Sequence, residues 1–540
     1  MQGTPISPGL AEGIVHVHGS LLGPIDIDAP ENIGRHNVEE EFSRLDVATM
    51  HISKDLVALA ERVEKEIDSR LASIFGSHQL ILDDSSLKAE LRKEIVENLV
   101  SASSAVKTVF LRWEKRFLLM ESQLARTKGD DVRDVSLRLR NALAGITVHH
   151  LEDIPPNSIL ATSRLLPSDT VFLADRSTAA VLLEHASFGS HAALFAREMG
   201  LPCISGLYNL TTTVPKGAFA LVDADTGTVT IDPQEKQKVV FRKKVDDKEH
   251  AHQLARKRAV GSAVTKDGVE ISVLANVGCA GDTERAMSNG AEGVGLYRME
   301  QAYLGRIVPP NSDELYHEMC QTLEAAKGHT VCVRLLDIGA DKPLPFMRFL
   351  AESNPSLGRR GIRLLREYPE LLMTHLRAVL ELAREFDVRV LVPMVTLAQD
   401  VTVVKDVLAQ LGSELRVSSL PKLGAMIETP AAALSAREIA KHVDFLSFGT
   451  NDLTQYAFAA DRENAAVEEY FDDTADVIFR LLRLTHDDVP DMPLSVCGEL
   501  AGRPEQIPRL LQCGIRSVSI APPLIPTIKE AIRDSTCTAP

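Results

Sequence analysis

The stretch VDFLSFGTND, residues 443–452, decides the fold, because a run of apolar residues ends abruptly in polar ones. A short apolar run without alternation is typical of a parallel strand that is buried on both faces. Seven further runs of this kind are VEISVLANVG, GVGLYRME, HTVCVRLLDIG, VRVLVPMV, KLGAMIE, PLSVCGE and SVSIAP. Helical stretches separate them. Eight strand-then-helix units within residues 261–540 predict a (β/α)8 barrel.

Polar residues follow many of these runs at the point where a barrel strand would end. Burying a polar group costs free energy unless it is paired, and barrel enzymes have their active sites at the carboxyl ends of the strands. The residues are Arg298, Arg334, Asp337, Glu428, Asn451, Asp452, Cys497 and Glu499. A surface salt bridge is the simpler interpretation of any one of them. For the whole set it would require a coincidence at most of the strands.

The chemistry of these side chains suits a small phosphorylated anion. Arginines provide planar forks for phosphate and carboxylate, and a lysine adds a point charge. The cations are Arg298, Arg334, Arg360, Arg462 and Lys342. Glu428 and Asp452 are hard oxygen donors, suited to a Mg²⁺ ion completed by waters and a substrate phosphate. Cys497 can serve as an acid, although a buried cysteine is more often inert packing.

The first half of the chain alternates between two kinds of sequence. Residues 1–32 and 146–232 hold short apolar runs with Gly and Pro, which predict a small α/β domain. Residues 33–145 have charged, helical spacing and predict an inserted helical subdomain. Residues 233–260 interleave acids and bases, which predicts a solvated linker helix before a barrel at 261–540.

One histidine in the α/β domain stands at the start of a predicted helix. His191 follows Gly189 and Ser190 and precedes AALFARE. The exposed N–H groups and the dipole of a helix N-terminus favour anions, so a phosphorylated histidine gains more there than a neutral one. On the local sequence alone, a solvent-facing histidine beside the N-cap is an equally good interpretation.

Composition limits the classes of function. The chain of 540 residues has a formal net charge of −16, which argues against non-specific nucleic-acid binding. Its 7 cysteines are scattered singly, without the pairs of a zinc site or a disulfide framework. We find neither an apolar membrane span nor a signal peptide, and so expect a cytoplasmic protein.

Long motifs in both halves of the chain point to one family. In the barrel they are GVGLYRMEQAYL, VRLLDIGADKPLPF, NPSLGRRGIRLL, MIETPAAA, DFLSFGTNDLTQYAFAADREN and CGELAGRP. In the first half they are GTPISPGLAEG, GSHQLILDD, DDVRDVSLRLRNAL and GSHAALFAREMGLPCISG. With these motifs the chain closely resembles the enzyme I family, the phosphoenolpyruvate-protein phosphotransferases of the bacterial sugar phosphotransferase system.

The resemblance implies a role for each matching residue. His191 would take the phosphoryl group of phosphoenolpyruvate and pass it to a histidine of the carrier HPr, which binds the helical insertion. The groups implied to bind phosphoenolpyruvate are Arg298, Arg334, Lys342, Arg360, Asn451, Asp452 and Arg462. Glu428 and Asp452 would bind Mg²⁺, and Cys497 would protonate the enolate of pyruvate. Arg133 would face the phosphohistidine, and the barrel would form a homodimer.

Other histidines have a weaker claim to function. His78 lies in the helical insertion, where we expect either a contact with the carrier or a solvated residue on the surface of a helix. His185 precedes the phosphohistidine segment and carries no motif of its own.

Two departures from the family keep alternatives open. Gly189 stands where the family commonly has a threonine, and the chain ends at Pro540, where the family usually continues with a further helical stretch. The first departure bears on the transfer rate or the partner, and the second on barrel closure or dimerisation. The alternatives are a paralogue in a regulatory phosphorelay with a different carrier, and a catalytically weakened regulator. A pyruvate phosphate dikinase relative is disfavoured, because no phosphate-binding glycine loop precedes the histidine.

Overall fold

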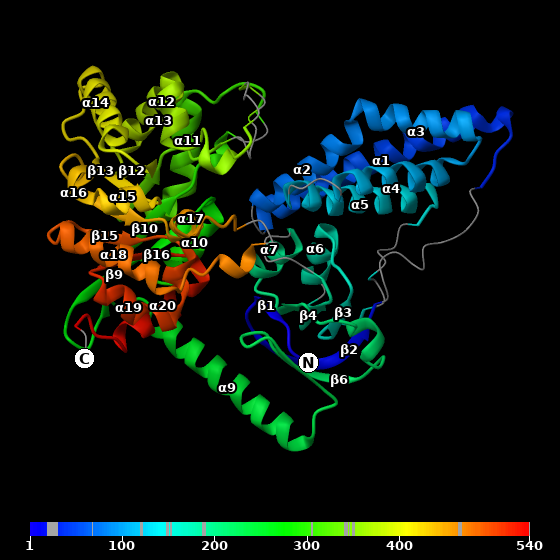
Figure 1. Ribbon diagram of the computed structural model, residues 1–540, viewed down its shortest axis with the longest axis horizontal. Coiled ribbons are helices and arrows are strands. Elements are labelled where there is room, and N and C mark those ends of the chain that lie inside the picture. Colours follow the sequence, from blue (N-terminus) through cyan, green and yellow to red (C-terminus); the bar gives the residue numbers. More distant parts are fainter. Residues whose placement is uncertain are drawn as a thin grey trace. The chain divides into compact units, whose positions relative to one another are not determined.

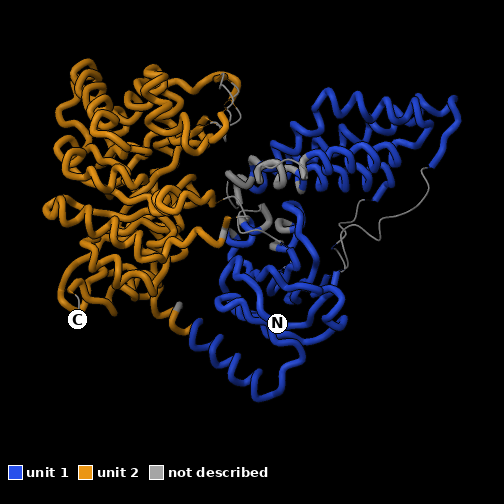
Figure 2. Tube along the Cα trace, in the orientation of Figure 1, with its two compact units in different colours: residues 1–248, 463–465 blue, residues 249–462, 466–540 orange. Residues whose placement is uncertain are grey.

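The computed structural model describes residues 1–18, 31–66, 69–118, 123–146, 151, 154–175, 177–185, 191–303, 306–339, 344, 346–347, 352–462 and 467–538. The chain divides into two compact units, residues 1–248 with 463–465 and residues 249–462 with 466–540 (Figure 2). Each unit has its own hydrophobic clusters.

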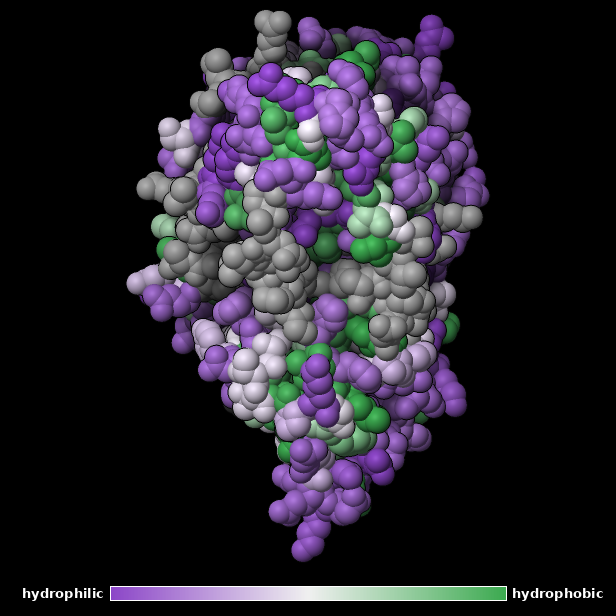
Figure 3. Space-filling view, turned by 90° about the vertical axis from the view of Figure 1, so that its right-hand side faces the viewer, coloured by the Kyte–Doolittle hydropathy of each residue, from purple (hydrophilic) through white to green (hydrophobic). Residues whose placement is uncertain are grey.

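The face that Figure 3 shows is mostly hydrophilic, and its apolar side chains lie in small separate groups. No described helix combines the length and the apolar character that a membrane crossing would need.

The first unit contains a mixed sheet (Figure 1). As far as the structure describes it, the sheet has seven strands in the order β1-β5-β4-β3-β2-β6-β7. They are β1 (Thr4–Ser7), β2 (Leu10–Val17), β3 (Ile159–Thr162), β4 (Ala180–Leu183), β5 (Cys203–Ser205), β6 (Phe219–Asp223) and β7 (Thr228–Ile231). Strands β2 to β5 run parallel to one another, and β1, β6 and β7 pair antiparallel at the two sides.

Both faces of this sheet are buried, and the side chains alternate between them. Ile159 and Leu182 belong to one apolar cluster, while their neighbours Leu160 and Val181 belong to another. The helices of this domain are α6 (Pro167–Asp175), α7 (His191–Glu198) and α8 (Leu210–Thr213). Because successive side chains of a strand point to opposite faces, strands covered on both sides read as unbroken apolar runs.

Between β2 and β3 the described residues form five inserted α-helices. They are α1 (Val38–Glu66), α2 (Ser69–Asp83), α3 (Ser85–Asn98), α4 (Ala102–Leu118) and α5 (Gln123–Leu143). Their apolar faces form one cluster, which also takes in Phe195 of α7. The rings of Phe195 and Phe75 lie 6.1 Å apart. Helix α7 therefore packs against both the sheet and the helical insertion.

His78 lies inside this helical insertion, and our expectation for it was wrong. Its side chain is 0 % exposed, so it neither meets solvent nor offers a surface to a carrier. Its Nε2 atom lies 3.3 Å from a carboxylate oxygen of Asp131, and its ring meets Phe75 edge-on. Asp131, on another helix, thus pairs one ring nitrogen of the buried imidazole, while Nδ1 has no hydrogen-bond partner in the described structure.

Helix α9 (Glu235–Arg258) leads into the second unit. There, within the described residues, eight parallel strands pair in chain order from β9 to β16, and β16 pairs with β9 to close the sheet. The strands are β9 (Glu270–Val277), β10 (Gly293–Tyr297), β11 (Thr330–Arg334), β12 (Asp387–Val395), β13 (Lys422–Ile427), β14 (Phe445–Phe448), β15 (Leu494–Val496) and β16 (Ser517–Ile520). A short strand, β8 (Ala263–Val264), pairs antiparallel with β9.

Helices follow the strands and cover the barrel (Figure 1). They are α10 (Ala280–Ser288), α11 (Ser312–Leu323), α12 (Ile362–Glu367), α13 (Pro369–Leu382), α14 (Ala398–Glu414), α15 (Pro430–Leu434), α16 (Ala436–Ala440), α17 (Thr450–Phe458), α18 (Asp476–Asp488), α19 (Ile507–Gln512) and α20 (Ile525–Arg533). The predicted fold class, an α/β domain with a helical insertion followed by a (β/α)8 barrel, is confirmed. The barrel closes although the chain ends at Pro540.

One buried histidine makes the stability of the barrel depend on pH. His375 of α13 is 0 % exposed, and neither of its ring nitrogens has a hydrogen-bond partner in the described structure. Burial lowers the pKa of His375 to about 3, against about 6.5 in an unfolded chain. The folded barrel therefore holds this ring neutral at pH values where the unfolded chain protonates it.

We predict that the barrel loses stability as the pH falls below 6.5, by about 1.4 kcal/mol for each pH unit down to about 3 from this residue alone. His375→Leu should remove that contribution, so the melting temperature of the barrel should fall less between pH 6.5 and pH 4.5 than in the wild type. The exposed His329 provides the matched control, His329→Leu. An equal pH dependence in wild type and His375→Leu would contradict the prediction.

Candidate active site at the barrel mouth

The structure gathers most of the predicted barrel residues at the carboxyl ends of the strands. Arg298 follows β10, Arg334 ends β11, Glu428 follows β13, Asn451 and Asp452 begin α17 after β14, and Cys497 follows β15. Arg360 lies in the long connection between β11 and α12. The alternation of apolar strand and polar end thus brings these groups to one end of the barrel.

Arg334 is held by two carboxylates. Its Nη1 donates to Asp337 at 3.1 Å and its Nη2 donates to Glu300 at 2.7 Å. Glu300 also accepts from the backbone N–H of Asp337 at 3.1 Å. The guanidinium is therefore oriented before any ligand binds. Binding then loses less side-chain conformational entropy.

Arg360 links two carboxylates that come from different strands. Its Nη2 donates to Asp337 and its Nη1 donates to Asp452, each at 2.9 Å. The hydroxyl of Tyr456 accepts from Arg360 Nη1 at 3.2 Å and donates to the backbone oxygen of Ser356 at 2.5 Å. Tyr456, which lies on α17, thus holds the loop of Arg360 against that helix.

Glu428 is a buried carboxyl group beside other acids. Burial, together with the negative charges of Asp452 and Asp337, raises its pKa to about 8. Its Oε2 accepts from the backbone N–H of Met394 at 2.6 Å. Met394 has φ 55° at a register shift of β12, a left-handed conformation that is costly for a non-glycine residue. This strained peptide aims its N–H at the carboxyl group.

The two carboxylates named as metal ligands fit a divalent cation. Glu428 and Asp452 are both buried, and the charge of Asp452 disfavours ionisation of Glu428, an effect that a shared cation would offset. In the part of the chain that the structure describes, no cluster of three or more His, Cys, Asp or Glu side chains forms a closed metal cage. Two carboxylates suit an ion whose remaining ligands are water and substrate oxygens.

Cys497 is a buried thiol at the inner side of the barrel mouth. Ser447 donates a hydrogen bond to its sulfur at 3.4 Å, and the thiol points to the backbone oxygen of Phe448 at 3.5 Å. Burial raises the pKa of Cys497 to about 11, despite the nearby Ser447 hydroxyl and the positive charges of Arg298 and Arg334. The thiol is therefore protonated at neutral pH, as a proton donor must be.

Two further predicted ligands lie toward the outside of this group, and a third falls outside the description. Asn451 exchanges hydrogen bonds with Glu499, accepting from its backbone N–H at 2.9 Å. Arg462 follows α17 with an exposed side chain, and its backbone N–H donates to Gln455 at 3.2 Å. Lys342 lies outside the described residues.

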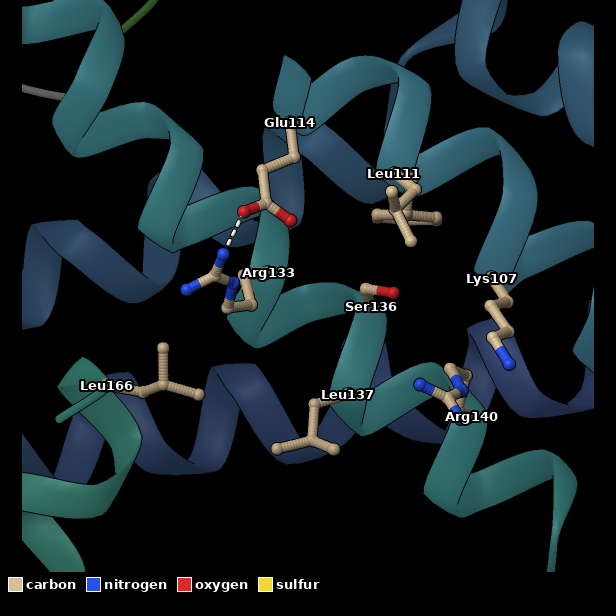
Figure 4. Close-up of a pocket in the computed structure, with 9 residues that line it drawn as sticks. Lys107, Leu111, Glu114, Arg133, Ser136, Leu137, Arg140 and Leu166 are labelled. Atoms are coloured by element: carbon tan, nitrogen blue, oxygen red, sulfur yellow. Dashed lines mark hydrogen bonds and ion pairs between the residues drawn. The ribbon is translucent and has the colours of Figure 1, made fainter. Parts of the chain in front are cut away.

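In the first unit, helix α7 begins at His191, as the sequence predicts. The side chain of His191 and the preceding residues 186–190 lie outside the description, so its proposed role stays a prediction. Arg133 of α5 forms an ion pair with Glu114 of α4 (Figure 4). This pair lies in a hollow that Lys107 and Arg140 also line. The suggested contact between Arg133 and the phosphohistidine likewise stays a prediction.

Sequence reasoning missed three groups at the barrel mouth. Glu300, two residues after Arg298, was passed over although it is also a charged residue beyond an apolar run. Tyr456 carried no signal, because its partners Ser356 and Arg360 lie about a hundred residues away in sequence. The backbone of Met394 acts through its conformation, which the sequence does not display.

Three family sequence profiles match successive parts of the chain. The profile described as "PEP-utilising enzyme, N-terminal" matches residues 2–128, that described as "PEP-utilising enzyme, mobile domain" matches residues 154–227, and that described as "PEP-utilising enzyme, PEP-binding domain" matches residues 252–537. The last profile alone covers more than half of the chain.

The chain is also similar to curated proteins along most of its length. The phosphoenolpyruvate-protein phosphotransferase of Haloferax volcanii is 34% identical over 521 residues, which cover 94% of this chain and 90% of that protein. The protein of the same name from Geobacillus stearothermophilus is 33% identical, covering 90% and 85% respectively. That of Mycoplasma pneumoniae is 34% identical, covering 95% and 90%.

We predict that Tyr456→Phe weakens the binding of a phosphorylated anion at Arg360, because the loop that carries Arg360 loses the hydroxyl bonds to α17 and keeps the Arg360–Asp452 ion pair. One hydrogen bond contributes about 0.5–1.5 kcal/mol, so the KM for phosphoenolpyruvate should rise about two- to tenfold. Tyr316→Phe is the matched control, since it removes a hydroxyl on α11 that donates to Glu385, after α13, at 2.6 Å. The prediction fails if Tyr456→Phe leaves KM unchanged or if both variants change it equally.

Proposed function

The chain belongs to the phosphoenolpyruvate-utilising enzyme family, and on that premise we propose that it is a phosphoenolpyruvate-protein phosphotransferase. It takes the phosphoryl group of phosphoenolpyruvate onto His191 and passes it to a histidine of an HPr-type carrier protein. The observation that carries this proposal is the buried group of alternating charges at the barrel mouth, Arg334, Asp337, Arg360 and Asp452.

Binding of phosphoenolpyruvate rests on the arginines. Arg334 and Arg360 offer planar forks that match phosphate and carboxylate oxygens, and Arg298 lies at the neighbouring strand end. The proposed set also includes three residues that are assigned from the family motifs, namely Lys342, Arg462 and Asn451. Phosphoryl transfer is mostly positioning and neutralisation of charge, which a group of prearranged cations supplies.

Magnesium is the proposed metal, held by Glu428 and Asp452. When bound, a divalent cation neutralises charge on the oxygens of the transferred phosphoryl group. Arg360 contacts Asp452 directly, so the guanidinium and the metal ligand are neighbours around the same substrate group. The ring of His191 takes the phosphoryl group at nitrogen, and the N–H groups at the start of α7 favour the added negative charge.

Cys497 is the proposed acid for the second half of the reaction. Loss of the phosphoryl group leaves the enolate of pyruvate, which needs a proton at its methylene carbon. A buried thiol that is protonated at neutral pH, beside the arginines that bind the carboxylate, meets that need.

The partner assignments come from the family. The inserted helices α1 to α5 are the proposed docking region for the carrier, and exposed apolar side chains such as Met50 and Leu80 support this. A homodimer through the barrel is part of the same proposal. Gly189 stands where the family commonly has a threonine. The alternative partner is therefore a different carrier protein, one that serves a regulatory phosphorelay.

Radiolabelled phosphoenolpyruvate with Mg²⁺ tests the proposal. We predict an acid-labile, alkali-stable label on the wild-type chain without added ATP, and no label on His191→Ala, because the acceptor nitrogen is gone. His185→Ala is the matched control, since His185 is an exposed histidine of the same domain. It should take up label normally.

Each other outcome has a definite meaning. Label on His191→Ala would show that another residue is the acceptor. An absolute requirement for ATP would indicate a dikinase, and a wild type without any label would indicate a regulator that has lost the chemistry.

A further inference from the structure

A polar bridge crosses the inside of the barrel below Cys497. The side-chain amide of Asn276, on β9, donates to the backbone oxygen of Cys497 at 3.1 Å. The hydroxyl of Ser519, on β16, donates to the amide oxygen of Asn276 at 2.7 Å. Strand β16 lies between β9 and β15 in the barrel, so the bridge spans three adjacent strands.

The barrel leaves room for this bridge. Gly295 of β10 faces Ser519, and a Cβ atom at that position would lie 2.5 Å from the Ser519 hydroxyl oxygen. Any side chain there would displace the serine. Ser519 is 2 % exposed, so the hydroxyl is committed to Asn276 and not to solvent.

The bridge bonds the backbone oxygen of Cys497, at the point where strand β15 has ended. The N–H of Cys497 donates to the backbone oxygen of Phe448 at 3.0 Å, which holds one side of its Cα. The other side leads to Gly498, where Thr450 approaches so closely that a Cβ atom would lie 1.9 Å from its hydroxyl. A glycine allows a wide range of backbone dihedral angles, so Gly498 itself does little to fix the orientation of the peptide group before it. Ser447 and Phe448 contact the thiol itself. The Asn276 amide adds a bond to the Cys497 backbone oxygen, which fixes the peptide that carries the side chain.

We propose that Asn276 and Ser519 are positioning residues for proton delivery by Cys497. This inference rests on the proposed function, in which Cys497 protonates the enolate of pyruvate. In that step a C–H bond forms at the methylene carbon from the π electrons of the enolate. The S–H bond breaks, its electron pair stays on sulfur as the thiolate, and water later returns a proton to the sulfur. One fixed thiol delivers the proton to one face of the enolate.

The variants are chosen to remove one link at a time. Asn276→Asp keeps the size and the acceptor for Ser519 but cannot donate to the Cys497 oxygen. Ser519→Ala leaves the Asn276 amide without its support. Ser495→Ala is the matched control, because the Ser495 hydroxyl donates to the Leu446 backbone oxygen at 3.3 Å in the same barrel without touching Cys497 or Asn276.

The readout is the stereochemistry of protonation. Phosphoenolpyruvate deuterated at one methylene position is turned over by the full chain with Mg²⁺ and carrier in tritiated water, and the configuration of the pyruvate methyl group is determined. Wild type and Ser495→Ala should give a single configuration. A misplacement of about 1 Å slows a reaction step by about 10²-fold. Enolpyruvate then leaves Asn276→Asp and Ser519→Ala unprotonated and takes its proton from water on either face, so the methyl group becomes racemic.

The ratio of the two configurations of the pyruvate methyl group does not depend on the amount of folded protein. A substitution that merely lowers the amount of folded protein would therefore leave this ratio unchanged. A single configuration in both variants overturns the inference while leaving the phosphotransferase function intact. A racemic product from the wild type overturns Cys497 as the acid, and with it the inference. A wild type that takes no label from phosphoenolpyruvate overturns both the function and the inference.

Discussion

The ion pairs that join Asp337, Arg360 and Asp452 are the constraint on which the barrel mouth depends. They tie the connection after β11 to the start of α17, two segments from different parts of the barrel. A buried charge that loses its partner costs several kcal/mol, so none of these groups can be removed without disturbing the others. The same charges that hold the loops together are those that a phosphorylated anion and a cation would engage. Under the proposed function, stability and binding therefore use one set of side chains.

Much of the fold could be predicted because parallel strands covered on both faces leave a plain mark in the sequence. The run from Val331 to Val333 is buried throughout, and it ends at Arg334, where the strand reaches the mouth. The helical insertion was equally plain from its spacing. The burial of His78 could not be predicted in this way, since the carboxylate of Asp131 that pairs with its Nε2 atom lies 53 residues away. The local sequence pattern does not show which side chains on two distant helices will pair.

The candidate site divides in the same way. Residues that sit directly at strand ends, such as Glu428 and Cys497, were found from position and chemistry. Groups that act by supporting them were missed, because their effect arises from contacts between strands. Tyr456 fastens the loop of Arg360, and Asn276 reaches across β16 to the peptide of Cys497. Local sequence shows which groups can react, whereas the closed barrel determines how firmly they are held.

The proposed function requires the barrel mouth to bind a divalent cation and phosphoenolpyruvate together through Asp452 and its neighbours. Electron paramagnetic resonance of Mn²⁺, titrated into the full chain with and without phosphoenolpyruvate, tests it most directly. We expect phosphoenolpyruvate to tighten Mn²⁺ binding at least about tenfold, equivalent to about 1.4 kcal/mol of coupling. Asp452→Asn should abolish this effect, while Asp488→Asn, at the end of α18, should preserve it. Equal Mn²⁺ binding by wild type and Asp452→Asn in the presence of phosphoenolpyruvate would contradict it.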